Sequence, residues 1–143
     1  MWQRLSIAGL LFALSACAPM PPAPGDAAAK RFEPVSDRAV IYVVRHPSER
    51  PFVAPILFDD QAIGSTYKGT YIRVVAPGGT HRISGMAGDS GLITLQAQPG
   101  QVYFINQTTY GYDALSGSQF QLVDAQYGRS MVLGGTMTGE FVR

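Results

Sequence analysis

The chain has 143 residues, with eleven Lys and Arg against ten Asp and Glu, a single cysteine, and 46% hydrophobic residues. This length suits one small domain, and a single cysteine excludes an intrachain disulfide. The charges balance without forming a basic stripe, which disfavours nucleic-acid binding, and no polybasic run favours adhesion to lipid headgroups.

Residues 1–16 have the pattern of a bacterial signal peptide. Arg4 supplies one positive charge, and Leu5–Leu14 is an uncharged run of about ten residues, within the ~7–15 residues typical of a secretory signal. The run is too short to cross a bilayer core, which needs about 20 apolar residues. We therefore expect a secretion signal rather than a transmembrane anchor.

Leu14, Ser15, Ala16 and Cys17 end this segment. They resemble the lipobox of bacterial lipoproteins, which implies transfer of a diacylglyceryl group to the Cys17 thiol and cleavage before this cysteine. Two or more acyl chains give a stable membrane anchor. Ala18 favours the outer membrane, by analogy with enterobacterial sorting, so we expect an envelope lipoprotein that faces the periplasm. An ordinary secretory signal followed by a chance cysteine is the alternative interpretation.

Residues 17–36 are rich in proline and alanine. Four prolines fall between Pro19 and Pro24, and proline forbids a regular helix and favours extended geometry. At about 3.1 Å per residue, the stretch from Ala18 to Lys30 would reach about 40 Å. We expect residues 17–36 to be a disordered linker that carries the lipidated cysteine.

Short apolar runs separated by turn residues follow the linker. The first, Ala39–Val44, is a continuous run of β-branched, aromatic and small residues, which is typical of a strand buried on both faces. Asp59 and Asp60 separate the next two runs and suit a tight hairpin. The expected strands after Ala39–Val44 are Pro55–Phe58, Gln61–Gly64, Thr70–Val75, Thr80–Gly85, Leu92–Ala97, Gln101–Asn106 and Phe120–Val123.

The spacing of these strands predicts an all-β fold: a single antiparallel β-sandwich or a partly open barrel over residues 37–133. Asp124 is placed to cap one short helix near the C-terminus, Ala125–Met131, which Gly128 weakens. We expect the glycine- and threonine-rich residues 134–143 to be a flexible tail.

The order of these features resembles a family of small bacterial lipoproteins that carry an all-β domain of unknown function. The resemblance covers Arg38 to Met131 and implies the fold rather than an activity, because that family offers no catalytic residues to transfer. One departure is Arg45-His46-Pro47, where such domains often carry Arg-Pro. The matching pieces are Ala39–Arg45, Gly64 with Gly69–Tyr71, Pro77–His81 and Pro99–Phe104.

Few residues suggest catalysis or a metal. Gly88–Gly91 contains Ser90 in a serine-protease-like Gly-Asp-Ser-Gly run, but Leu92 follows it and turn chemistry explains its composition. His46 and His81 lack the further ligands, at consistent spacing, that a zinc site needs. We therefore expect no enzyme activity, no metal site and no cofactor.

Tyr110 and Tyr112 are the remaining candidates for a partner-binding site. They flank Gly111 in a polar stretch, and tyrosine offers a large contact area with a polar tip. We expect a non-enzymatic envelope lipoprotein whose β-domain mediates binding or assembly, with an envelope protein or a glycan as partner. The alternatives are a periplasmic inhibitor or small-ligand binder that uses the Tyr110–Gln119 loop, and a hydrolase with an unrecognised site.

Overall fold

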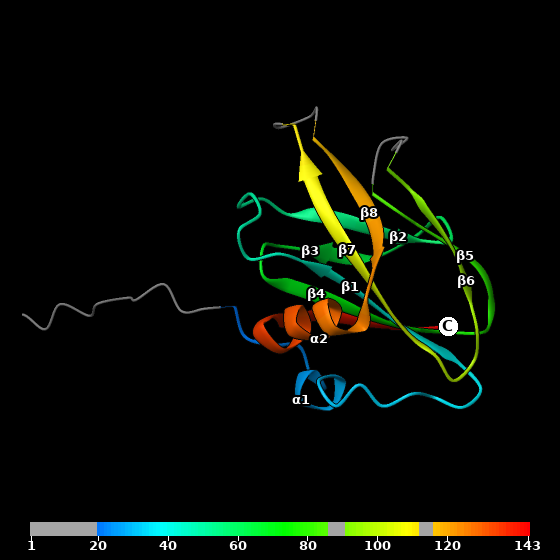
Figure 1. Ribbon diagram of the computed structural model, residues 1–143. Coiled ribbons are helices and arrows are strands. Elements are labelled where there is room, and N and C mark those ends of the chain that lie inside the picture. The colour runs from blue at the N-terminus through cyan, green and yellow to red at the C-terminus, as the bar shows by residue number, and fades with distance from the viewer. Residues whose placement is uncertain (1–19, 86–90, 112–115) are drawn as a thin grey trace, which may run out of the picture.

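The computed structural model describes residues 20–85, 91–111 and 116–143. Two β-sheets pack face to face, and two helices cover the outer face of the larger sheet (Figure 1). The elements in chain order are α1 (Asp26–Ala29), β1 (Ala39–Arg45), β2 (Ala54–Phe58), β3 (Gln61–Thr66), β4 (Thr70–Ala76), β5 (Gly79–Ser84), β6 (Ile93–Ala97), β7 (Val102–Tyr110), β8 (Gly117–Val123), α2 (Ala125–Gly134) and β9 (Thr136–Val142).

The predicted all-β sandwich with one short helix near the C-terminus is confirmed. The larger sheet has the strand order β8-β7-β1-β4-β9 and the smaller sheet the order β3-β2-β5-β6. The prediction that the strands are antiparallel is wrong for part of the larger sheet, because β1 pairs with β7, and β4 with β9, in parallel. Helix α2 connects β8 to β9, and strands that run in the same direction need such a crossover.

Strand β1 is the centre of the fold. All seven of its residues are buried, as its continuous apolar sequence predicts. Ile41 and Val43 face the core between the sheets, whereas Val40, Tyr42 and Val44 face a second core under the helices. The second core is aromatic: the ring of Tyr42 stacks on Phe104 with centroids 5.2 Å apart.

The hairpin between β2 and β3 turns at Asp59 and Asp60, as the sequence predicts. Their φ angles are 48° and 65°. Positive φ at both central residues is the signature of the tight turn that matches strand twist, and Asp tolerates it better than most residues.

Helix α2 begins as predicted at Asp124, whose side chain accepts a hydrogen bond from the Tyr127 N–H at 2.9 Å. Gly128 lies in the first half of the helix and is buried against the sheet. A Cβ atom there would lie 2.2 Å from Cγ of Phe104, so only glycine permits this close approach. The residue that weakens the helix locally is thus the one that lets it pack.

The prediction that residues 17–36 form a disordered linker is wrong from Ala23 onward. The Ala23 N–H donates to the Met137 carbonyl at 2.9 Å. Asp26 begins α1 and accepts hydrogen bonds from the Tyr71 hydroxyl and the Met137 N–H, each at 2.8 Å. Buried Ala29 then joins the second core. Composition did not show these contacts because each lies far away in the sequence.

The prediction of a flexible C-terminal tail is also wrong. Residues Thr136–Val142 form β9, an edge strand beside β4. Met137 is fully buried in the second core, and Phe141 packs against the core between the sheets. Met137 and Phe141 face different cores because the pairing with β4 shifts register between Met137 and Gly139, so no simple alternation marks this strand in the sequence.

Candidate functional site

The predicted site residues fall into two groups. Leu14, Ser15, Ala16, Cys17 and Tyr112 lie outside the described residues. Ser90, in the serine-protease-like run, lies outside them as well. Tyr110 ends β7 and exposes 41% of its surface, so one of the two tyrosines predicted to bind a partner lies in a described strand.

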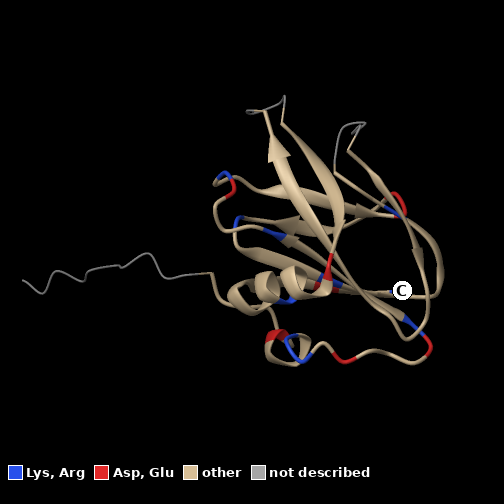
Figure 2. Ribbon diagram, in the orientation of Figure 1, with Lys and Arg blue, Asp and Glu red and all other residues tan. Residues whose placement is uncertain are grey.

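Strands β7 and β8, at the end of which this tyrosine lies, carry no charged side chain. Neither strand contains an Asp, Glu, Lys, Arg or His, and Figure 2 shows both without blue or red. Even-numbered residues of β7 lie opposite odd-numbered residues of β8. The outer-face pairs are Asn106 with Gln121, Thr108 with Gln119, and Tyr110 with Gly117.

A pocket of about 350 Å³ lies on this face. Its volume is at the lower end of the ~300–1,000 Å³ typical of small-ligand sites. The lining residues are Gly91 and Leu92 before β6, Asn106 and Thr108 of β7, and Gln119, Phe120 and Gln121 of β8. Among the described residues of this lining, every polar side chain is an amide or a hydroxyl.

Gly91 forms the wall of the pocket at the edge of β8. Its carbonyl accepts a hydrogen bond from the Phe120 N–H at 3.0 Å. A Cβ atom on Gly91 would lie 2.1 Å from the Ser118 carbonyl oxygen, so glycine allows this segment to lie directly against the strand. The wall is therefore fixed by a main-chain contact.

Asn106 has a buried polar atom without a partner. Within the described residues, its Oδ1 is shielded from solvent and accepts no hydrogen bond. A buried acceptor in this state costs about 1–3 kcal/mol. Such atoms are rare in native proteins and need an explanation, of which a ligand is one.

The Tyr110 ring lies across Gly117. A Cβ atom on Gly117 would lie 2.4 Å from Cζ of that ring. The loop after β1 fixes the neighbouring main chain, because Arg50 donates to the Gly111 carbonyl at 2.7 Å and Glu49 accepts from the Thr109 N–H at 3.0 Å. The exposed Tyr110 ring therefore lies between two residues, Thr109 and Gly111, whose main-chain groups are held by hydrogen bonds.

A buried polar group lies behind the hairpin. Gln107 is fully buried; its amide accepts a hydrogen bond from Thr66 and donates one to Ser118 at 2.8 Å. Arg45, which is 1% exposed, donates to the Phe52 and Arg50 carbonyls at 2.6 and 2.7 Å. Burial lowers the pKa of Arg45 below its ordinary value. These contacts join β7 to both sheets and rigidify the hairpin.

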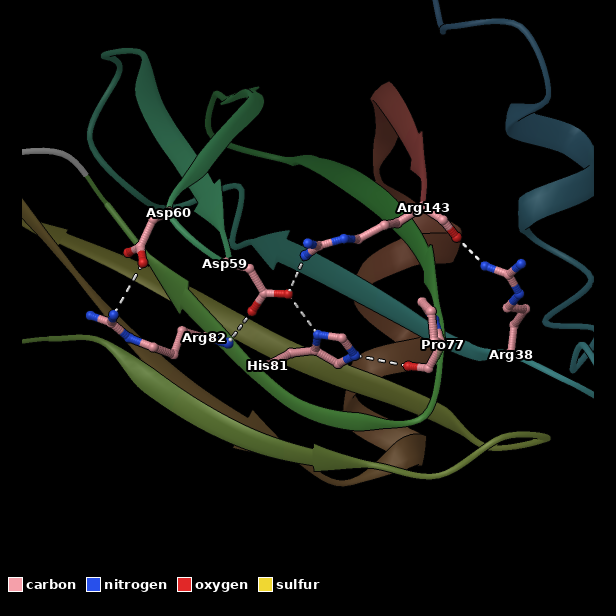
Figure 3. A network of polar contacts seen from close by, with 7 residues as sticks. All are labelled: Arg38, Asp59, Asp60, Pro77, His81, Arg82 and Arg143. Atoms are coloured by element: carbon pink, nitrogen blue, oxygen red, sulfur yellow. Dashed lines mark hydrogen bonds and ion pairs between the residues drawn. The ribbon is translucent and has the colours of Figure 1, made fainter.

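His81 belongs to a separate network (Figure 3). Its Nδ1 lies 2.8 Å from Oδ2 of Asp59, and its Nε2 lies 2.8 Å from the Pro77 carbonyl oxygen. Arg143 donates to the same Asp59 oxygen at 2.6 Å, and the Arg82 N–H donates to Oδ1 at 2.8 Å. In an Asp-His-nucleophile arrangement the second ring nitrogen faces a hydroxyl or thiol; here it faces a main-chain carbonyl.

Asp59 is held ionised by this network. Burial alone would raise the pKa of Asp59, but the hydrogen bonds from Arg82 and His81 and the charges of His81 and Arg143 outweigh it and lower the pKa below its ordinary value. The network joins the β2–β3 turn, β5 and the end of β9. Its geometry indicates a structural clamp.

His46 lies in an exposed loop after β1, where its Nδ1 accepts a hydrogen bond from the Ser48 N–H at 3.1 Å. In the described parts of the chain, no three His, Cys, Asp or Glu side chains gather as a metal site would require. No helix within those parts has the length and hydropathy to cross a membrane.

The amide residues of the pocket were not predicted as a site. The expected strand ends at Asn106, which leaves Thr108 and Tyr110 in the predicted loop, whereas β7 continues to Tyr110. The available signal is the alternation of polar residues at Asn106 and Thr108 and again at Gln119 and Gln121. Two such strands joined as a hairpin place all four side chains on one face.

Comparison of the chain with protein-family models, with curated proteins and with solved structures finds no match.

Proposed function

We propose that the protein is a non-enzymatic lipoprotein of the bacterial envelope, anchored through lipid on Cys17, whose sandwich mediates binding or assembly close to the membrane. The lipobox-like Leu14–Cys17 run supports the anchor. The observation that carries the proposal is the short chain between Cys17 and Ala23, where the first main-chain hydrogen bond to the sheet forms. A short tether suits a domain that works beside the membrane.

The tether sets the distance over which the domain acts. Six residue steps separate Cys17 from Ala23, and at about 3.1 Å per step they reach about 20 Å. This is half the span of a linker that extends to Lys30. A domain so tethered finds partners near the anchoring bilayer, and the proposed membrane is the outer one, with the domain in the periplasm.

The end of the domain that would face the bilayer follows from the same contacts. Ala23 bonds to Met137 at the start of β9, beside the C-terminal end of α2 (Figure 1). Leu133 lies at the C-terminal end of α2 and exposes 58% of its surface. Val142 is similarly exposed, at 66%, but lies at the opposite end of β9. The Leu133 end lies next to the tether.

Two features support a non-enzymatic role. In the pair formed by Asp59 and His81, the second ring nitrogen of His81 faces the Pro77 carbonyl rather than a hydroxyl or thiol. The pair also belongs to the network that joins the β2–β3 turn, β5 and the end of β9. The pocket on β7 and β8 is lined with amides and hydroxyls, groups that bind neutral polar ligands and are weak acids and bases.

The anchor is tested by Cys17→Ser. This variant should lose labelling by a fatty-acid analogue and leave the membrane fraction, while keeping the circular dichroism of a β-protein. Ala18→Ser, which keeps the thiol, is the matched control and should label like the wild type. Labelling of Cys17→Ser at the wild-type level would refute the lipid anchor.

The orientation is tested with single tryptophans. The only tryptophan of the chain is Trp2, within the proposed signal peptide, so an introduced tryptophan reports one place. Leu133→Trp should be quenched by vesicles that carry a headgroup quencher, and Val142→Trp, at the other end of β9, should be quenched much less. Equal quenching at both positions would contradict the orientation.

A further inference from the structure

We propose that the pocket on the outer face of β7 and β8 binds an uncharged saccharide. The inference deepens the proposed function, because it names the class of ligand that the membrane-tethered domain would hold. It depends on the pocket alone, so it can fail while the lipid anchor stands.

The absence of charge in both strands sets the first limit on the ligand. A charged ligand in this pocket would lose water without gaining an opposite charge from β7 or β8, which is unfavourable. The lining offers Asn106, Gln119 and Gln121 amides and the Thr108 hydroxyl. A neutral polar ligand fits this lining.

The density of amide groups sets the second limit. Each amide has two N–H donors and an oxygen with two lone pairs, so three of them offer donors and acceptors together. A ligand that matches them needs many groups that both donate and accept. Hydroxyl groups do this, and a sugar ring carries several in a small volume.

The buried Oδ1 of Asn106 points to the same chemistry. This atom is shielded from solvent and accepts no hydrogen bond within the described residues. Water does not reach this atom, so a sugar hydroxyl would bond to it only once the Asn106 side chain, which lines the pocket, turns toward the ligand. Binding would remove the cost of the unpaired acceptor, which is an interaction gained only with the ligand.

Apolar surface beside the amides completes the match. Leu92, which is 41% exposed, lies in the same lining. Tyr110 lies one pair further along the hairpin on the same face and exposes 41% of its surface. The C–H groups of a sugar ring pack against such surfaces while its hydroxyls reach the amides, and an oligosaccharide could extend from the pocket onto the tyrosine.

An extended peptide fits this place less well. A peptide that adds a strand at the edge of β8 would use the main-chain N–H groups of that edge. The Phe120 N–H already donates to the Gly91 carbonyl, and Gly91 lies directly against Ser118. The strand edge beside the pocket is therefore occupied.

The test is a calorimetric titration of the full mature protein, purified in detergent, with triacetylchitotriose and with cellotriose, both neutral. We expect binding of at least one at about millimolar or lower Kd. The affinity should not change when NaCl is raised from about 0.1 M to about 0.5 M, because screening acts only on charges. Trigalacturonate and tetra-alanine serve as the charged and peptide comparisons.

Gln119→Ala/Gln121→Ala tests the position of the site. Both side chains are exposed, so the fold should persist, and we expect the saccharide affinity to fall about tenfold or more. Gln96→Ala is the matched control, because Gln96 is an exposed glutamine of β6 in the other sheet. It should bind within about twofold of the wild type.

Three results would overturn the proposal. One is no binding of either neutral trisaccharide at millimolar concentration. Another is tighter binding of trigalacturonate or of tetra-alanine than of both neutral sugars, which would indicate a charged or a peptide ligand. The third is an equal loss of saccharide binding in Gln96→Ala and in the double variant.

Discussion

The outer face of the larger sheet has two halves that share strand β7 but differ in chemistry. Under α1 and α2 it is aromatic and closed, with Tyr42, Tyr71 and Phe104 buried. Further along β7 it carries Asn106 and Thr108 and holds a polar pocket. The difference shows that the helices cover only the part of the sheet whose side chains can exclude water. The other part carries polar side chains that line the pocket.

Two contacts position the helices on the aromatic half. Gly128 brings α2 against Phe104, and Asp26 ties α1 to Tyr71 and Met137. Tyr42 adds a buried hydrogen bond of 2.6 Å from its hydroxyl to the Ala29 carbonyl. Changing these residues should damage the aromatic half, whereas changing residues of the pocket should alter binding.

The largest effect is expected from Gly128→Ala. The new Cβ would lie 2.2 Å from Cγ of Phe104, so the helix must move away or the ring must leave its stack with Tyr42. We expect a loss of about 3 kcal/mol in the free energy of unfolding, measured by urea denaturation.

Gly134→Ala is its control at the end of the same helix, where a Cβ meets nothing within 4 Å. That variant should be as stable as the wild type or slightly more so, since alanine favours helix. Similar losses in both variants would contradict this account, because Gly134→Ala makes no contact with Phe104 and alanine favours helix.

A smaller effect, dependent on pH, is expected from Asp26→Asn. Burial alone would raise the pKa of Asp26, but hydrogen bonds from Lys30, Met137 and Tyr71 outweigh it and lower the pKa below its ordinary value of 3.8. A carboxyl whose pKa falls on folding stabilises the protein above its unfolded pKa. That stability is lost as the pH falls through the folded pKa.

Asp26→Asn should therefore cost about 1 kcal/mol near neutral pH and weaken the loss of stability below about pH 4. Urea denaturation at a series of pH values would measure both. Asp59→Asn should remove a separate part of the acid dependence, because the pKa of Asp59 is lowered by a different network. A wild-type acid dependence in Asp26→Asn would contradict this account.

The sequence predicted the elements better than their partners. The apolar run of β1, the Asp59-Asp60 turn and the Asp124 cap each depend on neighbours within a few residues, and all were predicted. Strand β9 depends on pairing with β4, 66 residues away at Thr70 and Thr136. The ordered segment from Ala23 depends on the still more distant contact of Ala23 with Met137. The composition of a segment does not indicate which distant segment it pairs with.

The candidate site was predicted only in part for the same reason. Tyr110 was identified because exposed tyrosine is a feature of binding surfaces. The amides are harder to identify, because an alternation of polar residues is also the ordinary pattern of a strand face exposed to solvent. They form a lining only through the register that pairs Asn106 with Gln121 and Thr108 with Gln119.

The smallest effect, and one of opposite sign, is expected from Asn106→Val. Valine removes an acceptor that is buried and unpaired in the described structure, and it suits a strand better than asparagine does. We expect the free energy of unfolding to rise by about 0.5–1 kcal/mol, while saccharide affinity falls. Thr108→Val, on the same face of the same strand, should change stability by less than about 0.5 kcal/mol. A destabilised Asn106→Val would mean that this side chain holds the fold together. The open half of the sheet would then be no different in kind from the half under the helices.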